Sequence, residues 1–186
     1  GNVINDIYDI ETDEVNKPDK VIVGNFISEK NAFNLFIVLS VVGVGLGFYL
    51  SNSIGKPQFA SLFVVISALL YLYASYLKQT FLIGNIVVSA LVAMSILIVG
   101  IFELIPREGI IQSTQLMFFD ILKDYALFAF SINFIREIIK DIQDIDGDYN
   151  AEMKTMPIVI GRERATKIAF VLSLLPLFGV TYYVIQ

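Results

Sequence analysis

Long apolar windows alternate with short polar segments along most of the chain. Four windows of 19 to 25 residues contain no charged side chain. A helix of about 20 apolar residues crosses the roughly 30 Å hydrocarbon core of a bilayer, so each window predicts a transmembrane helix. The four windows are 31–55, 57–77, 79–102 and 168–186.

A fifth apolar window, at 125–135, is too short to cross a bilayer alone. Its helix reaches membrane length if it extends from about Gln115 to Asp141, with charged ends at the interface or facing a cavity. The pattern therefore predicts an all-α, polytopic transmembrane helical bundle without a significant strand, preceded by a helix that ends near Asp13. The expected spans lie near 30–51, 58–77, 81–102, 116–145 and 162–186, with polar turns at 51–57 and 103–109.

Composition narrows the class of protein further. Charged residues make up 17% of the chain, against roughly 25% in ordinary soluble domains, and hydrophobic residues make up 56%. The net charge of −5 comes largely from two acidic clusters, and the chain lacks the basic face that nucleic-acid binding requires. Because there is no Cys and no His, any metal must be bound by oxygen ligands.

Successive spans must alternate in direction, which places every loop on one of two sides of the membrane. Loops 14–28 and 142–161 and the turn around Lys78 share a side with both acidic clusters. Ten of the thirteen basic residues lie on this side or flank its loops. The positive-inside rule then predicts an integral protein of the cell membrane with these clusters on the cytoplasmic side. The ten are Lys17, Lys20, Lys30, Lys78, Arg136, Lys140, Lys154, Arg162, Arg164 and Lys167, against Lys56, Arg107 and Lys123 opposite.

Both acidic clusters have the spacing of a helix face. In the first, Asn5, Asp9 and Asp13 recur at four-residue steps and Asp6 lies three residues before Asp9. Residues three or four apart lie on the same side of a helix, so all four side chains address one side. The second cluster has steps of 4, 4, 3 and 4, and its members are Asn133, Glu137, Asp141, Asp144 and Asp148.

Carboxylates held this close repel one another unless cations compensate them. Mg²⁺ binds through carboxylates, water and phosphate oxygens, which fits two acidic faces that converge on a diphosphate, and interleaved basic residues can bind the remaining phosphate oxygens. Solvated charge at helix ends is the simpler alternative for either cluster alone. We predict metal binding and catalysis by Asp6, Asp9, Asp13, Asp141, Asp144 and Asp148, and substrate binding by Asn5, Lys17, Lys78, Arg136, Lys140 and Tyr76.

Some polar and aromatic residues inside the spans allow two interpretations. Tyr71, Tyr73 and Tyr76 either line a pocket that stabilises a cation through cation–π attraction or form an interfacial aromatic belt. Asn85 and Asn133 are expected to be interhelical hydrogen-bond partners.

Together the two acidic motifs resemble those of the UbiA superfamily of intramembrane prenyltransferases. The first signature, N-D-x-x-D-x-x-x-D, is matched from Asn5 to Asp13 and is followed by a similar VNKPDK segment. The second, of the type D-x-x-D-x-x-G-D, is matched by 141–148, and KTMPIVIG resembles the K-T-L-P segment. Many relatives have Arg-Pro where this chain has Lys20 and Val21, so the resemblance does not carry a phosphate contact over to position 20.

The resemblance covers nearly the whole chain and implies a nine-helix fold. Residues 1–186 would form a single incomplete transmembrane domain, from late in the second span to the seventh, with the N- and C-terminal spans absent and the isolated piece inactive. The implied activity is Mg²⁺-dependent transfer of an isoprenyl group from a prenyl diphosphate to a lipid acceptor. The segment 136–148 is most similar to ether-lipid enzymes that transfer a geranylgeranyl group to geranylgeranylglyceryl phosphate.

Two alternatives to this activity stay open. The acceptor could be an aromatic compound or a quinone precursor, because relatives use the same acidic motifs on such acceptors. In a different class, the carboxylates could serve a divalent-cation transporter or a metal-stabilised scaffold.

Overall fold

The structure, a computed structural model, describes residues 1–104 and 113–185. This part of the chain is helical and contains no strand, only an isolated bridge between Val23 and Ile27. Its long helices are α3 (Glu29–Ser53), α4 (Ala60–Ser75), α5 (Ile83–Leu104), α6 (Ser113–Gln143) and α9 (Arg162–Ile185). The short elements are α1 (Asn2–Tyr8), α2 (Ile10–Asn16), α7 (Ile145–Asn150) and α8 (Met156–Ile160), with 3-10 turns η1 (Pro18–Lys20), η2 (Pro57–Phe59) and η3 (Leu77–Gln79).

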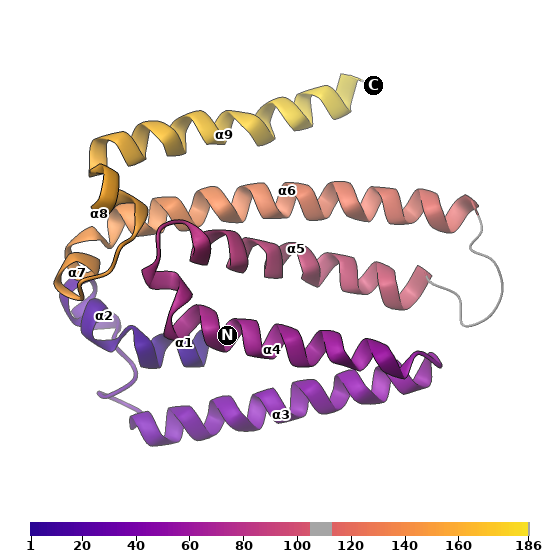
Figure 1. Ribbon diagram of the computed structural model, residues 1–186, viewed down its shortest axis with the longest axis horizontal. Helices are drawn as coiled ribbons and strands as arrows, with labels where there is room; N and C mark the ends of the chain where they lie inside the picture. The colour runs from indigo at the N-terminus through magenta and orange to yellow at the C-terminus, as the bar shows by residue number, and fades with distance from the viewer. Residues whose placement is uncertain (105–112, 186) are drawn as a thin grey trace.

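The long helices run along the longest dimension of the molecule in the order α3, α4, α5, α6, α9 (Figure 1). Consecutive helices run in opposite directions, as expected for spans joined by short connections. The most extensive helix contact joins α5 to α6, and α9 packs on the other side of α6. The bundle is therefore a row of antiparallel helices.

Four helical segments are long and apolar enough to cross a membrane, which confirms four of the five expected spans. At most 22% of the residues in their apolar windows are buried, so most of these side chains face outward. Such a surface suits lipid as the solvent, because water would be in contact with long rows of apolar side chains. The chain is an integral membrane protein. Among the described residues the segments are Glu29–Ser53, Pro57–Ser75, Ile83–Leu104 and Arg162–Tyr183, with mean hydropathy from 1.5 to 2.5.

The fifth expected span is a helix, but its composition differs from that of the other four. Helix α6 runs beside α5 along the bundle (Figure 1) and has 31 residues. Because charged side chains lie near both of its ends, α6 lacks an uncharged stretch of membrane length, and its crossing of the membrane stays a prediction. These are Asp120, Lys123 and Asp124 near one end, and Arg136, Glu137, Lys140 and Asp141 near the other.

Both acidic motifs contain a helix break at a central Asp, which the periodicity did not predict. The expected single helix ending near Asp13 is wrong: α1 ends before Asp9, and α2 continues to Asn16. Likewise, the helix predicted over 116–145 ends at Gln143, and α7 follows Asp144. The backbone angles at Asp9 (φ −98°, ψ 0°) and Asp144 (φ −93°, ψ 11°) lie in the sparsely populated bridge region.

The helices α1, α2, α7 and α8 gather at one end of the bundle, whereas the connection between α3 and α4 lies at the other (Figure 1). The sequence-based prediction that both acidic clusters share a side is therefore confirmed. The turn expected at 103–109 falls mostly outside the described residues, as does Arg107.

A small apolar core supports the acidic end. Ile138 of α6, Met156 of α8, and Ala165 and Ala169 of α9 are at most 5% exposed and pack together. The contact of these three helices fixes the end of α6 from which α7 begins.

Candidate active site

A polar cavity lies between the two acidic clusters. It measures about 480 Å³ with its open mouth included. The lining brings together residues from distant parts of the sequence, which confirms that the two clusters converge. The lining residues are Asp9, Thr12, Asp13, Asn16, Tyr73, Lys78, Asn85, Glu137, Lys140, Asp141, Asp144, Asp148 and Met153.

The first acidic cluster enters the cavity through Asp9 and Asp13. Asp9 accepts hydrogen bonds from Lys78 Nζ and Asn5 Nδ2. Thr12 donates its hydroxyl to the Asp9 carbonyl oxygen at 2.9 Å and supports the helix break. The buried Oδ1 of Asn5 has no hydrogen-bond partner in the described part of the structure. Asn5 itself lies outside the lining, so it acts on the cavity through its hydrogen bond to Asp9.

The second acidic cluster contributes four carboxylates to the cavity. Asn85 Nδ2 donates to Asp141 Oδ2 at 2.8 Å, and the buried Thr155 hydroxyl donates to Asp148 Oδ2 at 3.3 Å. Asp144 forms an ion pair with Lys17 at 2.7 Å. Glu137 lies one helical turn before Asp141 and accepts a hydrogen bond from the Tyr73 hydroxyl at 3.4 Å. Each carboxylate thus has a partner on a different element.

The side chain of Asn16 joins the two acidic motifs directly. Its Nδ2 donates to the Asp144 carbonyl oxygen at 3.0 Å, and its Oδ1 accepts from the Gly147 amide at 3.0 Å. A Cβ atom at Gly147 would lie 2.6 Å from the Thr12 carbonyl oxygen, so only glycine permits this approach of α7 to α2. The contact, which we call the Asn16–Gly147 clasp, sets the separation of the two motifs.

The cavity carries more negative than positive charge. Six carboxylates line it, and four cations face them: Lys78 and Lys140 in the lining, Lys17 paired with Asp144, and Arg136 paired with Glu137 at 2.6 Å. With every group ionised, two negative charges remain without a counter-charge. Such an excess in a partly buried space favours binding of a cation.

Burial shifts the pKa values of three charged groups that lie outside the membrane-spanning helices. Burial, with a smaller contribution from the Asp144 charge, raises the pKa of Asp148 to about 6. Burial and then the Asp9 charge raise the pKa of Asp13, although Lys17 opposes the shift. Burial lowers the pKa of Lys78 despite its contact with Asp9. The cavity therefore destabilises the charged forms of these groups in the absence of a ligand.

The oxygen donors of the cavity fit a hard divalent cation, because carboxylate and amide oxygens are the ligands such ions prefer. Within the described residues, however, no three carboxylates come close enough to form a metal site by themselves. Two lysines account for this, since Lys78 binds Asp9 and Lys17 binds Asp144. A cation would therefore take its remaining ligands from a bound anion or from water.

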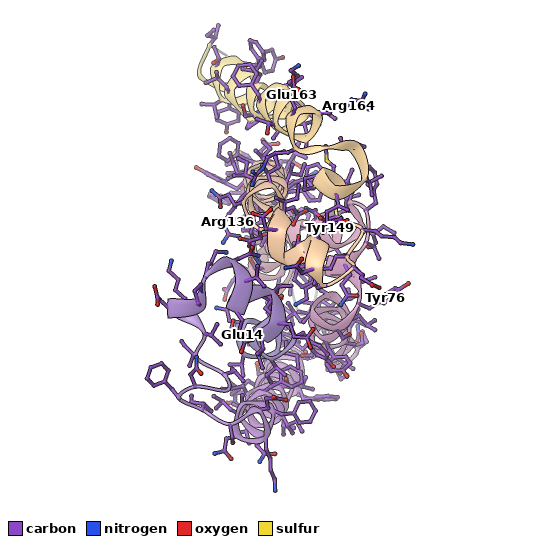
Figure 2. All side chains as sticks on the ribbon, turned by 90° about the vertical axis from the view of Figure 1, so that its left-hand side faces the viewer. Glu14, Tyr76, Arg136, Tyr149, Glu163 and Arg164 are labelled. Carbon is purple, nitrogen blue, oxygen red and sulfur yellow. The ribbon has the colours of Figure 1, made fainter. Side chains whose placement is uncertain are left out.

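Several predicted site residues lie outside the lining. Asp6 is exposed, and the side chains of Tyr76 and Arg136 are 63% and 68% exposed. Figure 2 shows Tyr76 and Arg136 at opposite edges of the acidic end. Asn5 and Lys17 lie outside the lining as well but bind Asp9 and Asp144. Substrate contacts from Tyr76 and Arg136 stay predictions that the cavity does not support.

Other lining residues were missing from the predicted site. Glu137 belongs to the spacing of the second cluster, so that signal was present in the sequence. For Tyr73 the sequence left a pocket and an aromatic belt open, and Tyr73 lines the cavity. The expected interhelical hydrogen bond of Asn85 is confirmed by its contact with Asp141 of α6. Thr12, Asn16 and Met153 carried no sequence signal, because their place in the site depends on the tertiary approach of α2 to α7.

Comparison with known proteins identifies similar chains. The digeranylgeranylglyceryl phosphate synthases of Methanosphaera stadtmanae and Methanopyrus kandleri are 33% and 34% identical over 175 and 174 residues, covering 94% of this chain and 58% of each relative. The synthase of Thermococcus gammatolerans is 33% identical over 193 residues, covering 98% of this chain and 63% of the relative. The chain thus spans about three fifths of the length of these relatives.

A solved structure, "Structural and mechanistic insights into the biosynthesis of Digeranylgeranylglyceryl phosphate synthase in membranes", has the same arrangement with a TM-score of 0.61. It is 26% identical and matches 98% of this chain and 60% of its own. The family model of the UbiA prenyltransferase family matches residues 1–186. The acidic cavity, the membrane-length helices and these similarities agree, and the chain belongs to the UbiA prenyltransferase family.

Proposed function

We propose that the protein containing this chain transfers a geranylgeranyl group from geranylgeranyl diphosphate to geranylgeranylglyceryl phosphate, in ether-lipid synthesis. The observation that carries the proposal is the convergence of both acidic motifs on one cavity at one end of a membrane bundle. The names of the similar synthases support the choice of prenyl group and acceptor.

In this reaction the allylic C–O bond of the donor breaks and the diphosphate leaves with the electron pair. The acceptor hydroxyl oxygen then forms an ether bond to the allylic carbon and loses its proton. Developing negative charge on the leaving group is the charge that a catalyst must stabilise. The donor diphosphate therefore belongs in the polar cavity and its prenyl chain among the apolar helices.

Mg²⁺ is the proposed cofactor, and when bound it would neutralise negative charge on the diphosphate. Its proposed ligands are Asp9 and Asp13 from one motif and Asp141, Asp144 and Asp148 from the other, with Asn5 Oδ1 as a further oxygen donor. Lys17, Lys78 and Lys140 bind phosphate oxygens that the cation leaves free. The partly buried Tyr73–Glu137 pair also lines this space.

We further propose that the cavity opens to the cytoplasm in the cell membrane. Basic residues are concentrated at the acidic end of the described bundle, as the positive-inside rule requires. The donor and acceptor would enter with their phosphate groups at this surface and their chains in the bilayer.

The proposal is tested with the full-length protein in lipid vesicles, supplied with geranylgeranyl diphosphate and Mg²⁺. Parallel reactions contain geranylgeranylglyceryl phosphate or a hydroxylated aromatic acid as acceptor, and mass spectrometry identifies the products. We expect a product only with the lipid acceptor. Prenylation of the aromatic acid instead would overturn the proposed acceptor, and no prenylated product with either would overturn the proposed function.

A further inference from the structure

The loop formed by residues 21–27, between η1 and α3, has one buried and one exposed apolar face. Val21 and Val23 are 6% and 4% exposed, whereas Ile22 is 51% and Phe26 83% exposed. An aromatic side chain presents about 150–250 Å² in total, so most of that area at Phe26 faces outward. Ile22 and Phe26 thus present apolar surface outside the long helices, in the loop that leads into α3.

A set of hydrogen bonds holds this loop in one conformation. The Gly24 amide donates to the Ile27 carbonyl and the Phe26 amide to the Ile22 carbonyl, both at 2.9 Å. Gly24 has φ +95°, a conformation that other residues adopt at a cost, and Asn25 Nδ2 binds the Val21 carbonyl at 3.1 Å. Because many of its backbone groups are already hydrogen-bonded within the loop, the loop gives up few hydrogen bonds to water when it enters the membrane interface.

The position of α3 places the loop at the level of the lipid headgroups. Helix α3 has 25 residues and begins at Glu29. At a rise of about 1.5 Å per residue it measures roughly 37 Å, longer than the hydrocarbon core of roughly 30 Å, so its ends reach the interface. The loop leads into α3 at the acidic end of the bundle (Figure 1), and Phe26 lies three residues before Glu29 in the sequence. Val38 and Val41 of α3 are also exposed, so the loop is followed in the sequence by a helix with exposed apolar side chains.

We propose that Ile22 and Phe26 insert into the boundary between headgroups and acyl chains and anchor the 21–27 loop to the surrounding bilayer. The flanking charges balance, Asp19 against Lys20 and Glu29 against Lys30, so apolar insertion and not attraction to anionic lipid drives the contact. The anchor holds α2, with Asp13 and Asn16, at a constant depth beneath the membrane surface. This inference does not depend on the proposed reaction.

Tryptophan fluorescence tests the proposal, because residues 1–186 contain no Trp. Phe26→Trp and Ile22→Trp are made separately in the full-length protein, with any tryptophan outside these residues replaced by phenylalanine. The matched control is Tyr149→Trp, since Tyr149 is 70% exposed on α7 and lies over the centre of the acidic end (Figure 2). Each variant is placed in vesicles of zwitterionic lipid, with and without bromine on the upper part of the acyl chains.

We expect brominated lipid to lower the emission of the Phe26→Trp and Ile22→Trp variants about twofold and to leave that of the Tyr149→Trp control nearly unchanged. Soluble acrylamide should quench the control much more than the two loop variants. Exchange for anionic lipid should not change the loop signal. Acrylamide quenching of the loop variants as strong as that of the control would overturn the proposal. Protection from both quenchers would overturn it as well, because another protein segment would then cover the loop.

Discussion

Replacement of Gly147 by alanine should impair prenyl transfer far more than it impairs folding. The added Cβ would lie 2.6 Å from the Thr12 carbonyl oxygen and 2.4 Å from Asn16 Nδ2, whereas ordinary contacts begin near 3.4 Å. The Thr12 oxygen belongs to the backbone and cannot rotate away. Helix α7 must therefore move from α2 by about 0.8 Å or more, the difference between 2.6 and 3.4 Å.

A displacement of this size breaks the Asn16–Gly147 clasp and separates the two groups of proposed metal ligands. Both hydrogen bonds of Asn16 measure 3.0 Å and would lengthen beyond the useful range. Overpacking costs about 1–3 kcal/mol of stability, while a misplacement of about 1 Å in a catalytic site lowers the rate about 100-fold. The assay compares the initial rate of prenyl transfer with the thermal midpoint for the full-length variant.

Gly45→Ala is the matched control, because no atom of the described residues lies within 4 Å of the position where its Cβ would be. Alanine is the better helix former by about 1 kcal/mol, so this variant should keep its activity and its stability. Asn16→Ala removes the clasp from the opposite side and should lower the rate without a steric clash. Near-native turnover of Gly147→Ala would refute the idea that α7 must approach α2 this closely.

Three further predictions concern the charges of the cavity. Asp9→Asn and Asp144→Asn should each lower the transfer rate about 100-fold or more, with little change in thermal midpoint. The control Glu152→Gln, at an exposed position outside the cavity, should leave the transfer rate unchanged. Unchanged turnover in the two Asp variants would favour simple solvated charge. Thorough chelation should abolish transfer, and added Mg²⁺ or Mn²⁺ should restore it; full activity in excess chelator would contradict metal dependence. Asp148 has a pKa of about 6, so below pH 6 a proton competes with the metal for its carboxylate. The rise in thermal midpoint caused by Mg²⁺ should therefore shrink below pH 6. A constant rise down to pH 5 would exclude Asp148 as a ligand. The folding stability of the metal-free protein should change with pH in the opposite direction. It should fall as the pH rises from about 4 to 6, because the folded state binds the proton of Asp148 more strongly than the unfolded chain does.

The hydropathy pattern predicted much of the fold because lipid-facing helices must be apolar along their whole length. That constraint explains the agreement for 30–51, 58–77 and 81–102 with helices α3 to α5. Helix α6 is harder to assign, since charged residues lie near both of its ends and only Glu137, Lys140 and Asp141 among them line the cavity. The breaks at Asp9 and Asp144 were not predictable, because helical spacing of three or four residues continues through both positions.

The candidate site shows the same division between local and tertiary information. Carboxylates at helical spacing identified Asp9, Asp13 and Asp141 because the spacing itself is the chemical signal. Asn16 enters the site only through contact with a segment 131 residues away, so a local pattern does not reveal it. Tyr76 was among the predicted substrate-binding residues and Tyr73 was not, but Tyr73 lines the cavity and Tyr76 is exposed.

A double-mutant cycle between the two acidic motifs tests most directly whether they form one site. Prenyl transfer is measured for the full-length protein, for Asp9→Asn, for Asp144→Asn and for the double variant, at saturating Mg²⁺. If both motifs act on one diphosphate, the double variant should be about as slow as the slower single variant, because residues that act as a unit are strongly non-additive. Losses that multiply, so that the double variant shows the product of the two single effects, would contradict a shared site.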